Sequence, residues 1–501
     1  MNLTNQSLNA LPLDHHDELV DLFVDRHLKY NSPRLHKLWD YYRNPMSNTT
    51  DRNVSGRQYQ LAQEQGLPLR LRSPVQVCTE DRTRTRERVI ENDIAWRIHT
   101  LVDFMFGRPF TLQSLAADRQ RAEMIENFLR LVFDVNGGIS FFQDLAMLGS
   151  VYGFVDVVLQ VDNHSTTTQT NNLLELARRF TLKIVEPTRS VPVLNPHDYR
   201  VLDAYIIHYN QQTNESQPTN LFNRLRSRAS SYVNNNKPNV LQCTELLTAD
   251  RHMVFQTRKT YRNCRRKLVS NTPNPIRQLP VVHIQNLPQP FFYEGLSEVE
   301  PLIPLQDELN TRLSDRANRI TLQSFKMYLG KGIQHFNDRP VGPGQMWTTD
   351  NTDAAVQEFG GDGQCPSEDA HINEIREAMD KTSSVTPVAA GMLRGKVGNL
   401  TSENALRIVL LGLLSKTERK RITYGRGIAN ICKLILHAAD MLQWITNAPE
   451  ERQIRLDWPD PLPQNQSELL KNAAVKLQVG VPARQVLTEL GYADLDVTSQ
   501  K

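Results

Sequence analysis

The chain has 501 residues, of which 39% are hydrophobic and 23% charged, and its formal net charge is +3. No stretch approaches the roughly 18–20 consecutive apolar residues that a membrane-spanning helix needs, so the sequence excludes an integral membrane protein of that kind. Its 58 basic and 55 acidic residues also exclude the strong positive excess of a histone-like nucleic-acid binder. The first residues lack a basic segment followed by an apolar one, and we therefore expect no secretory leader.

The first part of the chain is predicted to be mainly helical. Apolar residues at helical spacing indicate a helix over Asp14–Tyr42, which Pro33 divides and Asn44-Pro45 ends. The polar stretch Asn48–Gln76 is interpreted mostly as loop. Later helices are predicted over Arg86–Phe106, Ala116–Phe133 and Ser140–Gly149, with a short strand over Pro109–Leu112.

A β-rich pattern follows. Strands are predicted over Val151–Val161, Phe180–Val185, Tyr199–Tyr209, Met253–Tyr261 and Leu279–Ile284. Between two of them, Gln211–Asn239 is rich in Asn, Ser, Gln, Thr and Arg, which is typical of a long loop or insertion.

The second half returns to helices. Ser297 and Glu300 form a capping-box pattern, Pro304 should kink or restart the helix, and the apolar face continues to Ile320. The Gly- and Pro-rich span Gly330–Gly363 interrupts the helical pattern. The remaining predicted elements are strands Met327–Leu329 and Ala354–Phe359, and helices Glu368–Met379, Thr401–Trp444, Gln466–Gln478 and Pro482–Leu490.

No catalytic or metal-binding constellation occurs in the sequence. The stretch from Gly391 to Lys396 has three residues between its glycines and Val397 after the lysine, where a phosphate loop needs four residues and a Ser or Thr. Neither an HExxH nor a GxSxG motif is present. The five cysteines contain no Cys-x-x-Cys pair, which fits reduced thiols rather than a zinc ribbon. We expect no catalytic residue, no metal and no cofactor.

Two helices carry basic clusters that allow two interpretations each. Arg312, Arg316 and Arg319 share one face of the helix after Pro304, with Asp315 among them. They form either a solvated face with i,i+4 pairs such as Asp315–Arg319, or a channel or subunit-contact face. The second cluster is either solvated or in contact with DNA or an acidic partner, and it comprises Lys416, Arg419, Lys420, Arg421 and Arg426.

Six short stretches follow one another in a recognisable order: Tyr41–Pro45, Asp103–Leu112, Gly149–Asp162, Leu279–Asn286, Gly295–Ile320 and Val388–Leu414. This order resembles that of tailed-bacteriophage portal proteins, of the family in which the portal has about 500 residues. The best match is GLSEVEPLIPLQDELNTRLSDRANRI, from Gly295 to Ile320. Gln211–Asn239 departs from the family pattern as an insertion, and the span before Pro387 is short for a long second stem helix.

The resemblance implies an α+β portal fold with an α/β wing, a helical stem, a small β-containing clip, a tunnel loop, a long helix and an α-helical crown. The implied boundaries are 1–296 for the N-terminal helices and wing, 297–326 for the first stem helix, 327–367 for the clip, 368–385 for the second stem helix, 386–400 for the tunnel loop, 401–447 for the long helix at the base of wing and crown, and 448–501 for the crown.

The resemblance also implies a non-enzymatic ring, usually of twelve subunits, at one capsid vertex of a virion assembled in the host cytoplasm. Double-stranded DNA would be packaged and ejected through it. Expected partners are the terminase large subunit, the major capsid protein and scaffold, and a head-completion or neck adaptor; no membrane is expected.

In the tunnel loop, Arg394 and Lys396 would face DNA, and the glycines that let the loop change shape are Gly391, Gly395 and Gly398. Alternatives are another ring connector of capsid or tail, or a soluble nucleic-acid-binding module.

Overall fold

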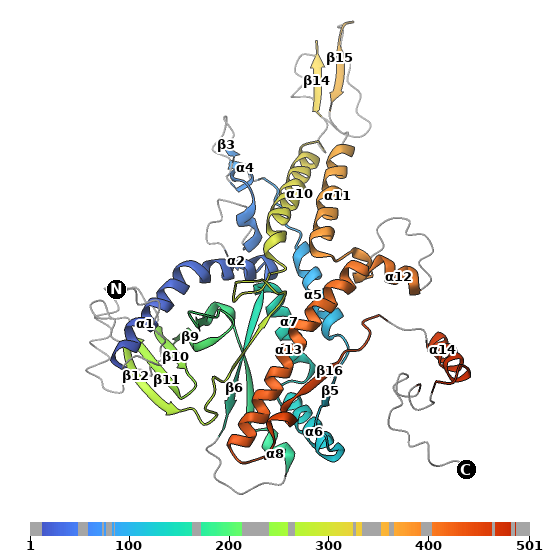
Figure 1. The fold of residues 1–501 in the computed structure, drawn as a ribbon. Helices are drawn as coiled ribbons and strands as arrows, with labels where there is room; N and C mark the ends of the chain where they lie inside the picture. Colours follow the sequence, from blue (N-terminus) through green and yellow to red (C-terminus); the bar gives the residue numbers. More distant parts are fainter. Residues whose placement is uncertain are drawn as a thin grey trace, which may run out of the picture. The chain divides into compact units, whose positions relative to one another are not determined.

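A computed structural model gives the fold of the chain (Figure 1). It describes residues 13–48, 59–72, 75–76, 83–84, 86–162, 172–212, 240–258, 266–323, 327–332, 352–359, 365–391, 403–462, 466–481 and 486. Most of the predicted insertion Gln211–Asn239, and all of the predicted helix Pro482–Leu490 except Val486, lie outside these residues. Within them, no helix is both long and apolar enough to cross a membrane.

The chain divides into two compact units. Unit 1 comprises Met1–Lys29, His99–Leu296 and Ser384–Lys501, and unit 2 comprises Tyr30–Ile98 and Ser297–Ser383. Both contain helices and strands, which agrees with the predicted α+β class. The longer helices are α1 (Leu13–Arg26), α2 (Ser32–Arg43), α5 (Asp93–Phe106), α6 (Arg119–Val135), α7 (Ile139–Tyr152), α10 (Ile303–Gln323), α11 (Pro366–Ser383), α12 (Glu403–Val409), α13 (Leu411–Met441) and α14 (Gln466–Gln478).

Two antiparallel sheets carry unit 1 (Figure 1). In the first, β6 (Phe154–Val161) lies between β13 (Val281–Gln285) and β7 (Phe180–Val185). The second has the order β12 (Arg266–Pro273), β11 (Arg251–Arg258), β10 (Val240–Leu247), β9 (Leu202–Gln212) and β8 (Ser190–Leu194). A smaller ladder joins β5 (Thr111–Ser114) to β16 (Ile454–Asp457), a strand that the sequence analysis missed.

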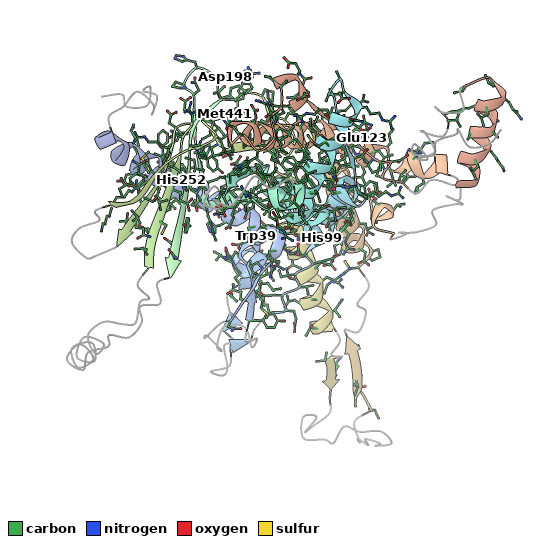
Figure 2. The ribbon with its side chains drawn as sticks, turned by 90° about the horizontal axis from the view of Figure 1, so that it is seen from below. Trp39, His99, Glu123, Asp198, His252 and Met441 are labelled. Carbon is green, nitrogen blue, oxygen red and sulfur yellow. The ribbon has the colours of Figure 1, made fainter. Side chains whose placement is uncertain are left out.

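Apolar faces hold unit 1 together. Leu19, Val20 and Val24 of α1 pack on Val191 and Ile206 of the second sheet. On the first sheet, α13 packs against β13 and β6, with its buried stripe of isoleucines and alanines facing the strands. In Figure 2, the label His252 marks β11 of the second sheet and the label Met441 marks the end of α13. Burial of these faces is the main driving force for folding.

In unit 2, α10 packs against α11, and a two-stranded ladder lies between them in sequence. The ladder pairs β14 (Met327–Lys331) with β15 (Ala355–Phe359), so both predicted strands of this region are confirmed. Ser297 Oγ accepts hydrogen bonds from the amides of Val299 and Glu300 at 3.1 and 3.2 Å, which caps the short 3₁₀ turn Glu300–Leu302 before α10. Pro304 then lies in the first turn of α10, where a helix tolerates proline.

Several predicted boundaries were right and others were wrong. α14 and β7 begin and end where predicted, and a five-residue π-helical turn, His27–Asn31, separates α1 from α2 just before Pro33. The long late helix is interrupted at Leu410, between α12 and α13, rather than at a glycine. Ile320, predicted on the buried face of α10, is 46% exposed.

The largest error concerns the predicted helix Arg86–Phe106, because α5 begins only at Asp93. Residues 86–92 are not helical, although Val89 and Ile90 continue the apolar spacing of α5. The prediction that Asn48–Gln76 is mostly loop was also incomplete. It contains β2 (Tyr59–Leu61), the 3₁₀ helix Ala62–Gly66 and α4 (Leu69–Arg72).

Candidate channel and subunit-contact residues

The three arginines predicted on α10 lie on its surface, and each pairs with a carboxylate of unit 2. Arg312 contacts Glu308 at 2.6 Å, one helical turn away. Arg316 Nη1 lies 2.9 Å from Asp369 Oδ1 on α11, and Arg319 pairs with Glu368 of the same helix.

Asp315 contacts Arg70 of α4, with Nη2 donating to Oδ2 at 2.9 Å. The predicted i,i+4 pair between Asp315 and Arg319 was therefore wrong, because Arg319 turns toward α11. The arginine side chains remain 25–38% exposed. A guanidinium has five N–H donors, so each can bind a further anion while keeping its present partner.

A second set of α10 side chains, unnoticed in the sequence, forms a polar ladder with residues 87–93. Successive amides two residues apart are paired with α10 side chains four residues apart, because two extended residues and one helical turn span nearly the same length. The backbone amides of Glu87, Val89, Glu91 and Asp93 donate to Asn318 Oδ1, Ser314 Oγ, Asn310 Oδ1 and Gln306 Oε1 at 2.9–3.1 Å.

The ladder also satisfies backbone carbonyls. Asn318 Nδ2 donates to the carbonyl of Glu87 at 2.8 Å, and Ser314 Oγ to that of Val89 at 3.2 Å. Asn310, which is fully buried, also donates to Gln63 Oε1 at 3.1 Å. Alternate peptide groups of the segment before α5 therefore have hydrogen-bond partners without helix or sheet. A polar residue at every fourth position, 306, 310, 314 and 318, was the sequence signal.

Unit 2 also buries an arginine close to this ladder. Arg97 is fully buried on α5, 3.1 Å from Asp93 Oδ2 and 2.7 Å from Asp380 Oδ1, and its Nη1 donates to Ser383 Oγ at 3.0 Å. Its guanidinium lies over the Trp96 ring, 4.5 Å from the centroid. A buried charge needs such partners to offset its desolvation, so Arg97 ties α5 to the end of α11.

The predicted tunnel loop is described only at its beginning. Gly391 follows the 3₁₀ helix Pro387–Ala390 with φ of +75°, a conformation that favours glycine. A Cβ at this position would meet no atom within 4 Å, so backbone conformation rather than space accounts for the glycine. Arg394, Gly395, Lys396 and Gly398 lie outside the described residues.

The basic cluster of α13 is largely buried, so neither of its two interpretations holds for most of it. Lys416, Lys420 and Arg421 are 5%, 0% and 8% exposed, whereas Arg419 and Arg426 are exposed as predicted. Lys420 Nζ donates to Ser150 Oγ of α7 at 2.8 Å. The three cations act inside unit 1 and do not form a DNA-binding face.

A buried polar cluster in unit 1 surrounds Asp156 of β6. It accepts hydrogen bonds from the hydroxyls of Tyr205 and Tyr293 at 2.8 and 2.9 Å, and His283 Nδ1 lies 2.7 Å away. Burial raises the pKa of both tyrosines well above its usual value, so each phenol keeps its proton and donates. The polar groups of this cluster bind one another, and Tyr205 and His283 thereby connect β9 and β13 to β6. Across the described residues, no group of three His, Cys, Asp or Glu side chains is arranged to hold a metal ion.

The family of the chain comes from comparisons with known proteins. The family model for phage portal proteins, SPP1 Gp6-like, matches residues 21–490, whereas no curated protein matches. Two of the matching solved structures are gene transfer agent particles. A native virion shares 11% identity with this chain over 79% of it and 88% of that chain, with a TM-score of 0.42. The neck of an empty particle, computed with C6 symmetry, shares 12% identity over 80% of this chain and 90% of that chain, with a TM-score of 0.46. Because the family model spans nearly the whole sequence, the chain belongs to the SPP1 Gp6-like phage portal protein family and is a structural, non-enzymatic component of the virion.

Proposed function

We propose that this portal protein forms a closed ring, of twelve subunits as the family resemblance implies, at one vertex of the capsid. Double-stranded DNA would enter and leave through the ring. The observation that carries this proposal is the family match over residues 21–490. The major capsid protein and scaffold would incorporate the ring during assembly in the host cytoplasm.

The region boundaries given above are part of the proposal. Support for the stem and clip comes from the succession α10, β14, β15, α11, in which two packed helices flank a strand ladder. In the compact units, residues 30–98 associate with 297–383. The segment carrying the polar ladder is thus part of the same unit as the proposed stem.

Ring formation is tested on the purified full-length chain. Negative-stain images should show closed rings with a central hole, and mass photometry at micromolar concentration should show one dominant oligomer. A chain that stays monomeric or dimeric, alone and with scaffold present, would contradict the proposal.

The terminase large subunit, and later the neck adaptor, are proposed to dock on the clip segment Gly330–Gly363. The sharpest variant joins Lys331 to Ala355 through Asn-Gly, because these residues face each other at one end of the β14–β15 register. The shortened chain should still form rings and should lose terminase binding. A matched control inserts Asn-Gly in the 482–485 segment, which the proposal assigns to the crown. Full terminase binding by the shortened ring would refute the docking site.

DNA is proposed to pass the tunnel loop, residues 386–400, where Arg394 and Lys396 would form rings of positive charge. Contacts with passing phosphates must be weak for DNA to slide, and screening over about 8–10 Å limits them. Arg394→Glu with Lys396→Glu should leave ring assembly intact and lower the yield of filled capsids. Arg319→Glu on α10 tests the proposed stem contact in the same assay. Normal packaging by both variants would show that neither set touches DNA.

A further inference from the structure

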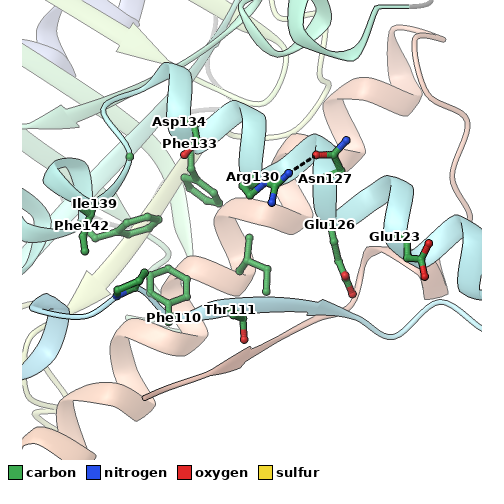
Figure 3. A pocket seen from close by; sticks show the side chains of 13 residues that line it. Phe110, Thr111, Glu123, Glu126, Asn127, Arg130, Phe133, Asp134, Ile139 and Phe142 are labelled. Carbon is green, nitrogen blue, oxygen red and sulfur yellow. Dashed lines mark hydrogen bonds between the residues drawn. The ribbon is translucent and has the colours of Figure 1, made fainter. Parts of the chain in front are cut away.

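An aromatic pocket lies in unit 1 between α6 and β5 (Figure 3). Its volume is about 750 Å³, and Phe110, Phe133 and Phe142 line one end of it. Phe133 and Phe142 are buried below the surface, and Ile139 at the mouth is 39% exposed. Pockets of this size hold groups as large as two phenyl rings. The pocket takes no part in the features described above.

Elsewhere on the same unit, two phenylalanines point into solvent. Phe291 and Phe292 are 83% and 57% exposed, in the loop between β13 and the start of α10. Phe291 adopts φ of +69°, which a residue with an aromatic side chain rarely accepts. Strained and exposed aromatic residues together are typical of a contact surface. We call Phe291 and Phe292 the aromatic knob.

The loop is anchored although the knob is exposed. Gln285 Nε2 donates to the carbonyls of Phe292 and Tyr293 at 3.0 and 2.9 Å. The amide of Leu296 donates to the carbonyl of Leu287 at 3.0 Å, which closes the base of the loop. The knob is thus held ready, and a partner would lose little conformational freedom in binding it.

We propose that the aromatic knob of one subunit inserts into the aromatic pocket of a second copy of this chain. The inference rests on the proposed ring. Knob and pocket belong to one compact unit but to separate sites on it, since Phe291 packs beside Tyr199, with ring centroids 6.5 Å apart, and neither residue lines the pocket. Figure 2 shows the same separation for Asp198, next to Tyr199, and Glu123, at the pocket rim. A knob and a hole at different places on one molecule make a head-to-tail contact, and such a contact closes into a ring when the rotation between neighbouring subunits closes.

Charge complementarity also supports a second copy of this chain as the molecule that fills the pocket. The pocket lining carries the carboxylates of Glu123, Glu126 and Asp134 and one arginine, Arg130, and Glu123 also forms an exposed pair with Arg119. Beside the knob, the Arg200 guanidinium lies 5.6 Å from the centroid of the Tyr199 ring, and its side chain is 74% exposed. Arg200 now pairs with Asp198 on the surface, a pairing that costs little to exchange for a rim carboxylate.

The contact is tested by placing the photo-crosslinking residue p-benzoylphenylalanine at position 292 of the full chain. Irradiated rings should yield cross-links between subunits that map to residues 109–142. The matched control carries the same residue at Val269, an exposed position of β12 in the same unit, and should not label that segment. Rings whose knob labels another segment, or none, would overturn this contact while leaving the proposed ring intact. A wild-type chain that forms no oligomer would overturn both.

A second variant separates assembly from folding. Phe291→Gly removes one ring of the knob and relieves its positive φ, so the monomer should melt at an unchanged or higher temperature. Its assembly midpoint should nevertheless rise at least tenfold in concentration. Ile139→Glu at the pocket mouth should weaken assembly in the same way. Assembly unchanged in both variants would contradict the proposal, as would a loss of monomer stability in Phe291→Gly that accounts for the defect.

Discussion

Two long helices, α10 and α13, each carry a block of basic residues, and the two units use them differently. On α10 the arginines lie on the surface beside carboxylates, and the buried face carries Gln306, Asn310 and Ser314 as well as Leu309 and Leu313. On α13 the buried face is apolar, and Lys416 and Lys420 lie within it. Unit 2 is thus joined at α10 by specific hydrogen bonds, and unit 1 at α13 mainly by close packing.

Because the two helices are held differently, they should tolerate different kinds of substitution. Packed apolar surfaces respond to volume, because an added methyl group must displace a neighbour. Hydrogen-bonded contacts respond to the loss of one partner, because the other is left buried and unsatisfied. Substitutions that change volume should therefore affect α13 more, and substitutions that remove an amide should affect α10 more.

The largest effect is expected for Gly427→Val on α13. A Cβ at Gly427 would lie 2.4 Å from Ile284 Cγ1 and 2.5 Å from its Cδ1, so either the buried Ile284 side chain or the helix must shift. We expect a loss of about 3 kcal/mol in the free energy of unfolding, measured by urea denaturation. Gly412→Val on the same helix is the control. Its Cβ has Ser384 Cβ at 3.8 Å as nearest neighbour, and it should change stability little. Equal losses would mean that helix propensity, not packing, decides.

Next comes Asn310→Ala in the polar ladder. The change leaves the amide of Glu91 and the Oε1 atom of Gln63 without their Asn310 partner and should cost about 2 kcal/mol. Asn318→Ala removes the same chemistry at a more exposed rung and should cost less than half as much. Hydrogen exchange of the peptide covering residues 86–93 should accelerate more in the first variant. If the two variants behave alike, burial does not set the strength of the ladder.

A pH change should affect the two units in opposite directions. In unit 1, burial and then the nearby charges of Arg266 and His27 lower the pKa of His208 to about 4. The unfolded chain then binds more protons between pH 6.5 and 4, so unit 1 loses stability as the pH falls, by about 1–2 kcal/mol after allowance for screening.

In unit 2, burial raises the pKa of Asp307, despite its hydrogen bond from Tyr41. Here the folded state binds more protons above pH 3.8, so this contribution weakens as the pH rises through the folded-state pKa. Rate-corrected hydrogen exchange at pH 7 and 5 should show unit 1 peptides losing protection. His208→Gln should abolish that loss, and Asp307→Asn should leave it unchanged.

The smallest effect is expected for the surface ion pairs of α10. Arg316→Ala breaks a pair with Asp369, whose side chain is 61% exposed, and should change the free energy of unfolding by less than about 1 kcal/mol. The change should vanish in 1 M salt. A larger loss would show that α10 also depends on its surface charges and would weaken the contrast with α13.

Local patterns in the sequence predicted much of the fold. β7, α14, the paired strands β14 and β15, and the proline-marked break before α2 follow from alternation, periodicity and proline chemistry. Residues 86–92 were predicted wrongly because their apolar spacing matches a helix, whereas partners more than 200 residues away satisfy their backbone instead. No local rule reveals such partners.

The candidate site residues were predicted less completely. The surface position of the α10 arginines was foreseen, and their acidic partners on α11 and α4 were not. Charge spacing on α13 suggested an exposed face, yet α13 is contacted from several sides, so a lysine has a buried position for its long stem and a hydroxyl for its ammonium. How many sides of a helix are covered is a property of the fold, not of the helix sequence.

In the polar ladder, the two backbones advance by slightly unequal distances from one hydrogen-bonded pair to the next. Four residues of α10 advance roughly 6.0 Å, while two extended residues advance roughly 6.6 Å. The mismatch of roughly 0.6 Å per rung reaches about 2 Å over the three intervals from Gln306 to Asn318. Amide and hydroxyl side chains of different lengths can absorb that difference, but a much longer ladder would fall out of step. The unequal advance of the two backbones therefore limits how many rungs a contact of this kind can hold.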